Sequence, residues 1–304
     1  MGHSVCRPPM LQKLFRLVAL LILGTSLAHA EIVVRDDAGN TVRLKEPARR
    51  IVSLSPHVTE TLYAAGAGDH LVGAVEYSDY PPAAKQLPRI GGSARLDLEA
   101  IAALKPDLAI GWDGGNSTAH LAKLRSLGIP VYLVAPEHIE DVAAALERYG
   151  ELAGTQDSAH RAADAFRERI RQLRQRYQAR ATVRTFYQIW NEPLMTVGGT
   201  QVISDAIRLC GGENVFGALA PLAATVSVEA VLAADPEAII ASGADDSRPA
   251  WLDDWRRWRN LTAVKRDNLF FLPPDLIQRH TPRLVEGVAR LCAQLEAARQ
   301  RRGR

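Results

Sequence analysis

The chain has 304 residues, of which 47% are hydrophobic, and its 37 Lys and Arg residues are nearly balanced by 34 Asp and Glu residues. The whole excess of positive charge lies in the first thirty residues, which argues against a protein that holds nucleic acid by neutralising many phosphates. The remaining chain is long enough to bury two hydrophobic cores, because single cores seldom grow beyond about 250–300 residues.

The first thirty residues have the pattern of a secretory signal peptide. Three basic residues precede an apolar run over 17–27, and Ala28-His29-Ala30 forms an A-x-A cleavage site. The run is short for a bilayer span, and no second long apolar segment follows it. We therefore expect removal of residues 1–30 and export of a soluble chain to the periplasm.

The segment from residue 31 to 155 has the alternation of a mostly parallel α/β lobe. Apolar residues over 31–44 alternate around Asp37-Ala38-Gly39-Asn40, which predicts a β-hairpin. Helical segments then separate short apolar strands, an order typical of a parallel sheet with helices on both faces. The predicted strands are Ile51–Leu54, Leu71–Val75, Leu108–Ile110 and Val131–Val134.

Capping residues mark the helix starts of this lobe. Ser55 places a hydroxyl before Pro56, and proline suits the first position of a helix. Asp97 precedes the next helix, and Asn116 or Ser117 precedes a third.

A long charged segment follows at 156–180. Its apolar residues, Phe166, Ile170, Leu173 and Tyr177, recur at three- and four-residue spacing, which predicts one long amphipathic helix. We interpret this helix as the connection between an N-terminal lobe, residues 31–155, and a C-terminal lobe, residues 181–304.

The α/β alternation resumes after the connecting helix. We expect strands at Thr185–Ile189, Ala238–Ala241 and Leu269–Leu272, and helices at Gln201–Leu209, Ser227–Ala234, Leu252–Trp258 and from Thr281. Thr281 before Pro282 repeats the capping pattern of the first lobe. The spacing of Trp251, Trp255 and Trp258 predicts helix packing in the core, and the arginine-rich end of the chain, 299–304, is expected to be a frayed, solvated helix terminus.

One helix-to-strand unit occurs in both lobes. Leu98–Ile110 and Val228–Ile240 share apolar spacing and proline position, and Glu99 of the first matches Glu229 of the second. Each acid lies in the first turn of its helix, so a favourable interaction with the helix dipole is the alternative to a shared function.

Two cysteines, Cys210 and Cys292, remain after the signal peptide. In an oxidising compartment a disulfide between them is the expected pairing, with two buried free thiols as the alternative. Two isolated cysteines do not make a zinc site.

The sequence contains no G-x-S-x-G, H-E-x-x-H, Walker A or G-x-G-x-x-G pattern, so we do not expect an enzyme. No two histidines share an i, i+4 helix face, and no metal site is predicted. His57 and His280 stand out because each follows a predicted strand, where ligands gather in α/β sheets. A secreted metal-dependent enzyme remains the alternative from a different class, and surface positions remain the alternative for both histidines.

Aromatic side chains lie beyond several predicted strand ends, in segments with turn residues: Tyr77, Tyr80, Trp112 and Trp190. Large rings in loops are typical of ligand contacts. Asp275, Arg279 and Arg283 follow the last strand, and such groups bind amides or carboxylates, although a local Asp275–Arg279 surface pair fits the spacing equally well.

Six segments together resemble the helical-backbone periplasmic binding proteins that feed metal-chelate importers. These are Arg50-Ile-Val-Ser-Leu-Ser-Pro56, Tyr77-Ser-Asp-Tyr-Pro-Pro82, Leu104-Lys-Pro-Asp-Leu108, Gly114-Gly-Asn116, Cys210-Gly-Gly-Glu-Asn214 and Thr281-Pro-Arg283. The resemblance implies two Rossmann-like lobes joined by the single helix at 156–180, with the ligand bound between the lobes.

The resemblance also implies roles for individual residues. It assigns ligand contacts to Tyr77 or Tyr80, Trp112, Asp275 and Arg279, with Trp190 next to a position where the family has an aromatic residue. It assigns docking onto arginines of a membrane permease to Glu99 and Glu229, and it agrees with a Cys210–Cys292 disulfide.

The ligand that the resemblance implies is cobalamin or a related corrinoid, carried as cargo and not as a cofactor. A monomer would deliver it to the permease of an ABC transporter, and no nucleic acid is involved. Haem or a ferric siderophore is the alternative, with His57, His280 or a tyrosine as axial ligand. Ser93 and Ala223 stand where the best-known corrinoid binder has tryptophans, which leaves the alternative open.

Overall fold

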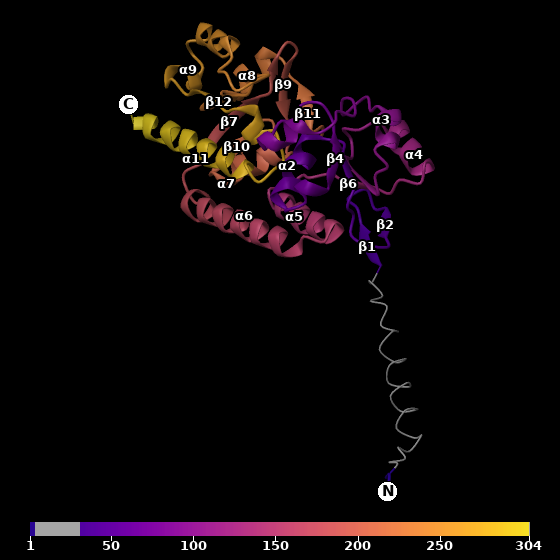
Figure 1. The fold of residues 1–304 in the computed structure, drawn as a ribbon. Helices are drawn as coiled ribbons and strands as arrows, with labels where there is room; N and C mark the ends of the chain where they lie inside the picture. The colour runs from indigo at the N-terminus through magenta and orange to yellow at the C-terminus, as the bar shows by residue number, and fades with distance from the viewer. Residues whose placement is uncertain (4–30, 304) are drawn as a thin grey trace.

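The structure is a computed structural model that describes residues 1–3 and 31–303 (Figure 1). The predicted signal peptide therefore lies outside the described residues, apart from its first three. Within the described part, no helix has the length and apolar character needed to cross a membrane. The names N-terminal lobe and C-terminal lobe denote residues 31–155 and 181–303, and this division itself stays a prediction.

The N-terminal lobe contains the predicted hairpin and a parallel sheet. Strands β1 (Ile32–Arg35) and β2 (Thr41–Leu44) pair antiparallel, and Gly39 has a positive φ of 84° in the turn between them. The four-stranded sheet has the order β4-β3-β5-β6 with all neighbours parallel. Its strands are β3 (Ile51–Ser53), β4 (Leu71–Ala74), β5 (Leu108–Trp112) and β6 (Val131–Val134), at the predicted places.

Two of the four α-helices of this lobe begin with a side-chain cap. The four helices are α2 (Pro56–Ala64), α3 (Leu98–Ala103), α4 (Thr118–Ser126) and α5 (Glu140–Ala153), with 3₁₀ turns η2 (Gly68–His70) and η3 (Pro82–Gln86). Asp97 and Ser117 cap α3 and α4 through their side chains. The prediction for Ser55 is wrong: its hydroxyl bonds the ring of His57 and makes no cap bond to α2.

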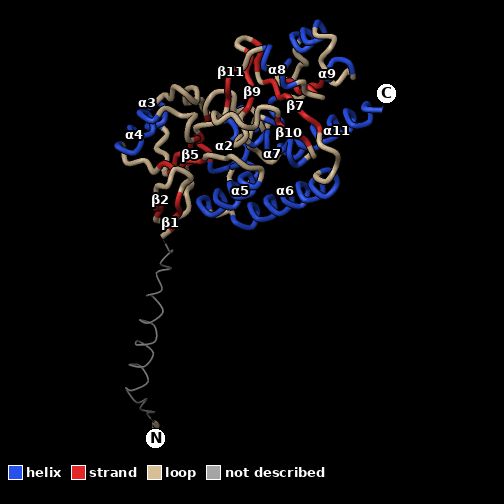
Figure 2. The backbone as a smooth tube through the Cα atoms, turned by 180° about the vertical axis from the view of Figure 1, so that it is seen from behind, coloured by secondary structure: helices blue, strands red, loops and turns tan. Residues whose placement is uncertain are grey.

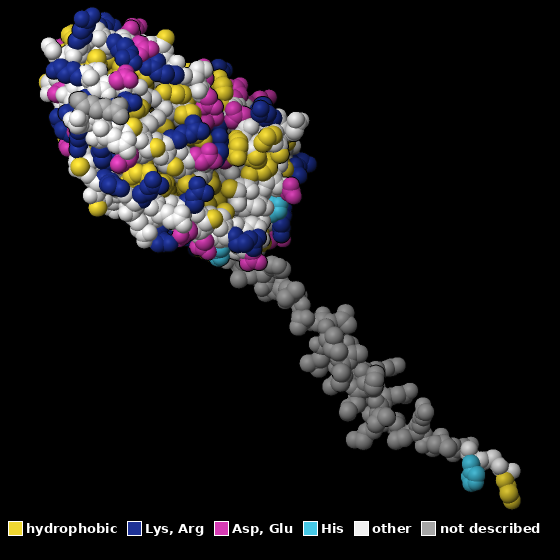
Figure 3. All heavy atoms as spheres, turned by 90° about the vertical axis from the view of Figure 1, so that its left-hand side faces the viewer, with side chains coloured by type: hydrophobic (Ala, Val, Ile, Leu, Met, Phe, Trp, Pro, Cys, Tyr) yellow, Lys and Arg dark blue, Asp and Glu magenta, His cyan; other side chains and the backbone are white. Residues whose placement is uncertain are grey.

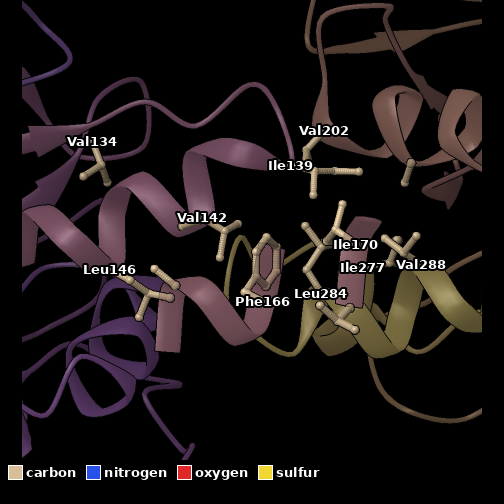
Figure 4. Packing of buried hydrophobic residues seen from close by; sticks show 14 of the residues in the cluster. Val134, Ile139, Val142, Leu146, Phe166, Ile170, Val202, Ile277, Leu284 and Val288 are labelled. Atoms are coloured by element: carbon tan, nitrogen blue, oxygen red, sulfur yellow. The ribbon is translucent and has the colours of Figure 1, made fainter. Parts of the chain in front are cut away.

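Helix α6 (Gln156–Tyr177) follows α5 after a left-handed turn at Gly154. Its buried face carries Phe166 and Ile170, which belong to a hydrophobic core shared with both lobes. Figure 4 shows Phe166 beside Val142 of α5, and Ile170 close to Ile277 and other side chains of the C-terminal lobe. A core that is continuous across α6 ties both lobes to one helix.

The C-terminal lobe contains a second parallel sheet of order β10-β7-β12-β13. Its strands are β7 (Val183–Gln188), β10 (Gly212–Asn214), β12 (Ala238–Ala241) and β13 (Leu269–Phe271). A small antiparallel sheet, not predicted, joins β8 (Trp190–Asn191), β9 (Leu194–Val197) and β11 (Ala223–Thr225). Strands of two to four residues are too short to give a readable alternation, which explains why the sequence did not reveal this sheet.

The helices of the C-terminal lobe are α7 (Val202–Leu209), α8 (Val228–Ala234), α9 (Thr262–Lys265), α10 (Pro274–Ile277) and α11 (Leu284–Gln300), with 3₁₀ segments η4 (Ala250–Arg257) and η5 (Arg301–Gly303). The last long helix begins at Leu284, so Thr281 is not its cap. The Thr281 hydroxyl is instead buried without a hydrogen-bond partner among the described residues.

The expected common face of Trp251, Trp255 and Trp258 is not formed, because η4 is a 3₁₀ helix. Such a helix has about three residues per turn, so residues four and seven apart do not share one face as they would in an α-helix. Trp255 is 5% exposed and packs in the core, whereas Trp258, which follows the end of η4, is 38% exposed.

The predicted disulfide is present between Cys210, at the end of α7, and Cys292 of α11. Both cysteines are fully buried. The bond closes a sequence separation of 82 residues and fastens α11 to the end of α7.

The arginine-rich end is not a solvated, frayed terminus. Arg299 donates to the backbone carbonyls of Ala181, Cys210 and Gly211, and Arg302 pairs with Glu237 at 2.8 Å. These arginines bind backbone carbonyl oxygens and a carboxylate of the C-terminal lobe. On the face drawn in Figure 3, basic and acidic side chains are interspersed, so neither sign of charge dominates it.

Candidate functional site

Two arginines of the C-terminal lobe reach carboxylates of the N-terminal lobe. Arg283 donates from Nε and Nη2 to the two carboxylate oxygens of Glu60 on α2, at 2.7 and 2.6 Å. Glu60 is only 3% exposed, and the Arg283 guanidinium also lies 3.8 Å above the ring centre of Tyr80. This buried bidentate pair, here called the interlobe latch, fixes Tyr80 against the C-terminal lobe.

The second arginine, Arg279, contacts one carboxylate of each lobe. Its guanidinium lies 2.8 Å from Asp79 and 3.0 Å from Asp275. Burial raises the pKa of Asp79, but the Arg279 hydrogen bond and charge outweigh it and hold this pKa below its ordinary value. For Asp275 the effect of burial is larger than that of the Arg279 charge, so the pKa of Asp275 is raised. Arg279 therefore compensates the charge of Asp79 more fully than that of Asp275.

Two histidines, one from each lobe, lie against each other beside Trp112. The ring centre of His57 is 5.8 Å from that of His280 and 5.5 Å from that of Trp112, both edge to face. The Ser55 hydroxyl bonds His57 Nδ1 at 2.7 Å, and the other nitrogen, Nε2, is buried without a partner among the described residues. In the part of the chain that the structure covers, no three or more His, Cys, Asp or Glu side chains are grouped to hold a metal ion.

Burial lowers the pKa of both imidazoles. The pKa of His57 falls to about 3 through burial and through the nearby His280 and Arg279, and the pKa of His280 falls to about 4 through burial. Both rings are therefore uncharged at neutral pH, so that the two lobes meet here without charge repulsion.

Acidification is expected to destabilise the protein through these two rings. An unfolded histidine has a pKa near 6.5, so between this pH and about 4 the unfolded chain binds more protons than the folded one. The free energy of unfolding should therefore fall as the pH falls through this range. Urea denaturation across the range should show a shallower fall for His57→Gln than for the parent. His160→Gln, on the exposed face of α6, is the control; parallel curves for all three proteins would contradict the assignment.

The sheets explain why these side chains converge. His57 follows β3 and Trp112 ends β5, both at the carboxyl edge of the parallel N-terminal sheet, and α10 with Asp275 follows β13. The Trp112 ring lies directly over Gly115, where an added Cβ would come within 1.9 Å of it. Ligand positions in α/β proteins occur at this edge of a sheet.

The structure joins four of the six predicted ligand residues. They take part in three groups of contacts: Trp112 and His280 pack against His57, Arg279 pairs with Asp79 and Asp275, and Tyr80 lies under Arg283. Tyr77 is 77% exposed and Trp190 is 39% exposed, and neither side chain forms a hydrogen bond, ion pair or ring contact with this cluster within the described residues. Trp190 lies in strand β8 and not in a loop.

Sequence reasoning missed two residues of the cluster, Glu60 and Asp79. Glu60 lies one turn after His57 on a helix whose other residues near it are buried, and a carboxylate in such a place signals a buried partner. Asp79 lies between Tyr77 and Tyr80, the two candidate ligand tyrosines, so its position in the sequence also indicates a place in the site.

Glu99 and Glu229 lie apart from this cluster. Each is exposed in the first turn of a short helix, α3 or α8, and neither forms an ion pair with another described residue. The backbone amide and the Ser227 hydroxyl lower the pKa of Glu229, so it is charged at neutral pH. Figures 1 and 2 both place α3 and α8 on the side of the molecule away from α5 and α6.

Comparisons with known proteins give a consistent result. Residues 51–276 match the family model described as periplasmic binding protein. A vitamin B12-binding protein of Vibrio parahaemolyticus is 37% identical over 260 residues, which cover 84% of this chain and 93% of that protein. The crystal structure of the periplasmic vitamin B12 binding protein BtuF of Vibrio cholerae has a TM-score of 0.77 at 37% identity, covering 84% of this chain and 99% of that one. A periplasmic heme binding protein from Pseudomonas aeruginosa has a TM-score of 0.69 at 26% identity, covering 81% and 92%.

Proposed function

This chain belongs to the periplasmic binding protein family, and from that premise we propose that it captures cobalamin or a related corrinoid and delivers it to the permease of an ABC importer. The observation that carries the proposal is the agreement between two independent features. Relatives that are 37% identical over the aligned residues are named as vitamin B12 binders, and four of the six residues expected to touch such a ligand lie at or beside contacts between the lobes.

The cluster has the chemistry that a corrinoid requires. The ligand has a broad macrocycle, which aromatic faces such as those of Tyr80 and Trp112 would cover. It also carries peripheral amides, each with N–H donors and a carbonyl acceptor. Asp275 would accept from the amide N–H groups, and Arg279 would donate to an amide carbonyl. Tyr77 and Trp190, which are exposed in the structure, would add apolar cover at the rim.

The interlobe latch supports binding to a largely preformed site. With Glu60 and Arg283 paired and a core shared through α6, the lobes are held close without a ligand. A preformed site avoids much of the entropy cost of ordering loops when the ligand binds. No bond is made or broken in this function, and the cobalt complex is cargo.

Haem is the second candidate, and one observation favours it. His57 Nε2, which is buried and has no hydrogen-bond partner among residues 1–3 and 31–303, is a nitrogen of the type that binds haem iron. His280 lies beside it from the other lobe, and one structural relative is a heme binding protein.

Titration of the mature protein with cyanocobalamin and, separately, with hemin tests the proposal. We expect saturable cobalamin binding in calorimetry and no comparable hemin binding in the visible spectrum. Arg279→Ala should weaken cobalamin binding about tenfold or more, because it removes a charged hydrogen-bond donor. Arg290→Ala, an exposed arginine on α11, is the control. Tight hemin binding without cobalamin binding would reverse the choice of ligand.

Docking on the permease is proposed for Glu99 and Glu229. Both carboxylates are exposed and unpaired within the described chain, one in each lobe, on the side of the molecule away from the connecting helix. A pair of free acids at separated points suits a partner that presents cationic side chains at two places.

A further inference from the structure

One ring nitrogen at the contact between the lobes is buried and has no hydrogen-bond partner. It is Nε2 of His57, a residue that is 7% exposed, and no group among residues 1–3 and 31–303 bonds it. An unpaired polar atom in a protein interior is costly, because it has lost its water and gained nothing in exchange. Such an atom in a native fold calls for an explanation, and a role in binding supplies one.

The other nitrogen of the same ring is held by Ser55. The Ser55 hydroxyl lies 2.7 Å from Nδ1 and makes no cap bond to α2, although Ser55 directly precedes this helix. Serine in this position normally caps its helix. Here the hydroxyl orients an imidazole, as the hydrogen-bond partners of metal-binding histidines do. When the Ser55 oxygen accepts the Nδ1 proton, Nε2 presents a free lone pair.

The ring of His57 lies where the two lobes meet. Trp112 packs against it from the same lobe, and His280 packs against it from the other lobe. Burial, with the charges of His280 and Arg279, lowers the pKa of His57 to about 3, so the ring is uncharged at neutral pH and a metal need not displace a proton from it. A ligand that enters between the lobes here replaces the His280 contact.

His70 is the other imidazole with a buried, unpartnered nitrogen in the described chain, and its position differs. His70 directly precedes β4, so it lies at the amino end of the N-terminal sheet, whereas His57 follows β3 at the carboxyl end. The second nitrogen of His70 contacts the Arg49 guanidinium at 2.9 Å. Ligands in α/β proteins occupy the carboxyl end of the sheet. His57 is therefore the imidazole that is placed to meet a ligand.

A single imidazole does not hold a free metal ion, but it can complete the coordination of a chelated one. A zinc site takes three or four protein ligands. Within the two described ranges, no three His, Cys, Asp or Glu side chains are grouped in this way. A corrinoid supplies four ring nitrogens to its own cobalt and leaves the two axial positions for other ligands, so one oriented histidine is enough.

We propose that Nε2 of His57 binds the cobalt of the cargo as an axial ligand. The step is an exchange with bound water: the Co–O bond breaks, the Nε2 lone pair forms a Co–N bond, and the water leaves without a change in the oxidation state of the cobalt. His57 thereby selects corrinoids that have an exchangeable axial ligand. The proposal rests on the proposed function and names its preferred substrate class.

Two corrinoids with the same macrocycle and the same amides test this selection. Aquacobinamide has exchangeable axial ligands, whereas dicyanocobinamide has cyanide in both axial positions. Calorimetry on the mature protein should show about tenfold tighter binding of aquacobinamide. In His57→Gln the preference should disappear, and in His160→Gln, changed on the exposed face of α6, it should persist. Equal affinities in the parent, or a preference that survives in His57→Gln, would overturn the proposal.

Electron paramagnetic resonance identifies the bound nitrogen directly. Cob(II)inamide, prepared before mixing, has an unpaired electron that couples to an axial nitrogen, and it has no nitrogen base of its own. Bound to the protein, it should show a triplet splitting that becomes a doublet when the histidines carry nitrogen-15. His57→Gln should lose the splitting and His280→Gln should keep it. A bound spectrum without nitrogen splitting, or a splitting lost only in His280→Gln, contradicts the assignment.

These measurements separate the role of His57 from the proposed function. If neither cobinamide nor cobalamin binds, the proposed function itself is contradicted. If they bind without nitrogen coupling, corrinoid capture stands and the role of His57 is wrong. Hemin bound through His57 with no corrinoid bound overturns both, because the same nitrogen can bind haem iron.

Discussion

Replacing Arg283 with alanine is expected to lower the free energy of unfolding by about 3–5 kcal/mol, the range found when one partner of a buried ion pair is removed. The physical reason is the position of Glu60. Its carboxylate is 3% exposed and accepts both hydrogen bonds of the interlobe latch from Arg283. Without the guanidinium, this carboxylate must stay charged and poorly solvated, take up a proton, or force the lobes apart.

The two partners of the latch should not be equivalent. Glu60→Ala leaves Arg283 without its partner. The Arg283 side chain is 18% exposed and stacked on Tyr80, so the unpaired guanidinium is better solvated than an unpaired Glu60 carboxylate, which is 3% exposed. We therefore expect a smaller loss for Glu60→Ala than for Arg283→Ala, and a double mutant that is less destabilised than the sum of the two.

A matched control for burial exists in the same lobe. Arg248 pairs with Asp253 through two hydrogen bonds of 2.7 and 2.9 Å, a bidentate geometry like that of the latch, but both side chains are more than a third exposed. Arg248→Ala should cost no more than about 1 kcal/mol. Equilibrium urea denaturation followed by circular dichroism measures all four variants. If Arg283→Ala and Arg248→Ala lower the free energy of unfolding equally, burial of Glu60 does not increase the cost of removing its partner.

The sequence predicted the repeating elements well because their signals are local. The hairpin at 31–44, the strands of both parallel sheets except β10, and helix α6 all follow from alternation or from helical spacing of apolar residues; β10 was not predicted. A predicted hydroxyl cap is present only where the residue directly precedes the helix and its hydroxyl has no other partner. Ser117 and Ser227 cap their helices, whereas the Ser55 hydroxyl is taken by His57 and Thr281 lies three residues before its helix.

The contacts between the lobes could not be read from the sequence. Glu60 and Arg283 are 223 residues apart, and Asp79 and Arg279 are 200 apart, so no spacing rule links them. Sequence reasoning found Asp275 and Arg279 as neighbours on one helical turn, which is a local relation. The same limit applies to the terminal arginines, whose carbonyl partners lie more than eighty residues away along the chain.

Replacing Glu99 and Glu229 together with alanine is expected to abolish stimulation of cobalamin transport while leaving cobalamin affinity unchanged. Both carboxylates are exposed, carry no ion pair within the described chain and lie away from the cluster that we propose to bind the ligand. Removing them deletes the two charges that would attract cationic side chains of the permease. Transport into proteoliposomes that contain the transporter, with calorimetry on the free protein, separates delivery from capture.

The competing explanation is that both acids serve only their helices. A carboxylate in the first turn favours the helix through the dipole, so its loss would reduce stability slightly and leave transport intact. Asp157 of α6 and Glu286 of α11 are exposed acids in the first turns of their helices, and a double alanine variant at these positions changes the net charge by the same amount. Loss of transport in the Glu99 and Glu229 variant alone supports docking. Equal transport in both double variants would assign the two glutamates to helix stability, and the sequence repeat would then reflect only the shared architecture of the lobes.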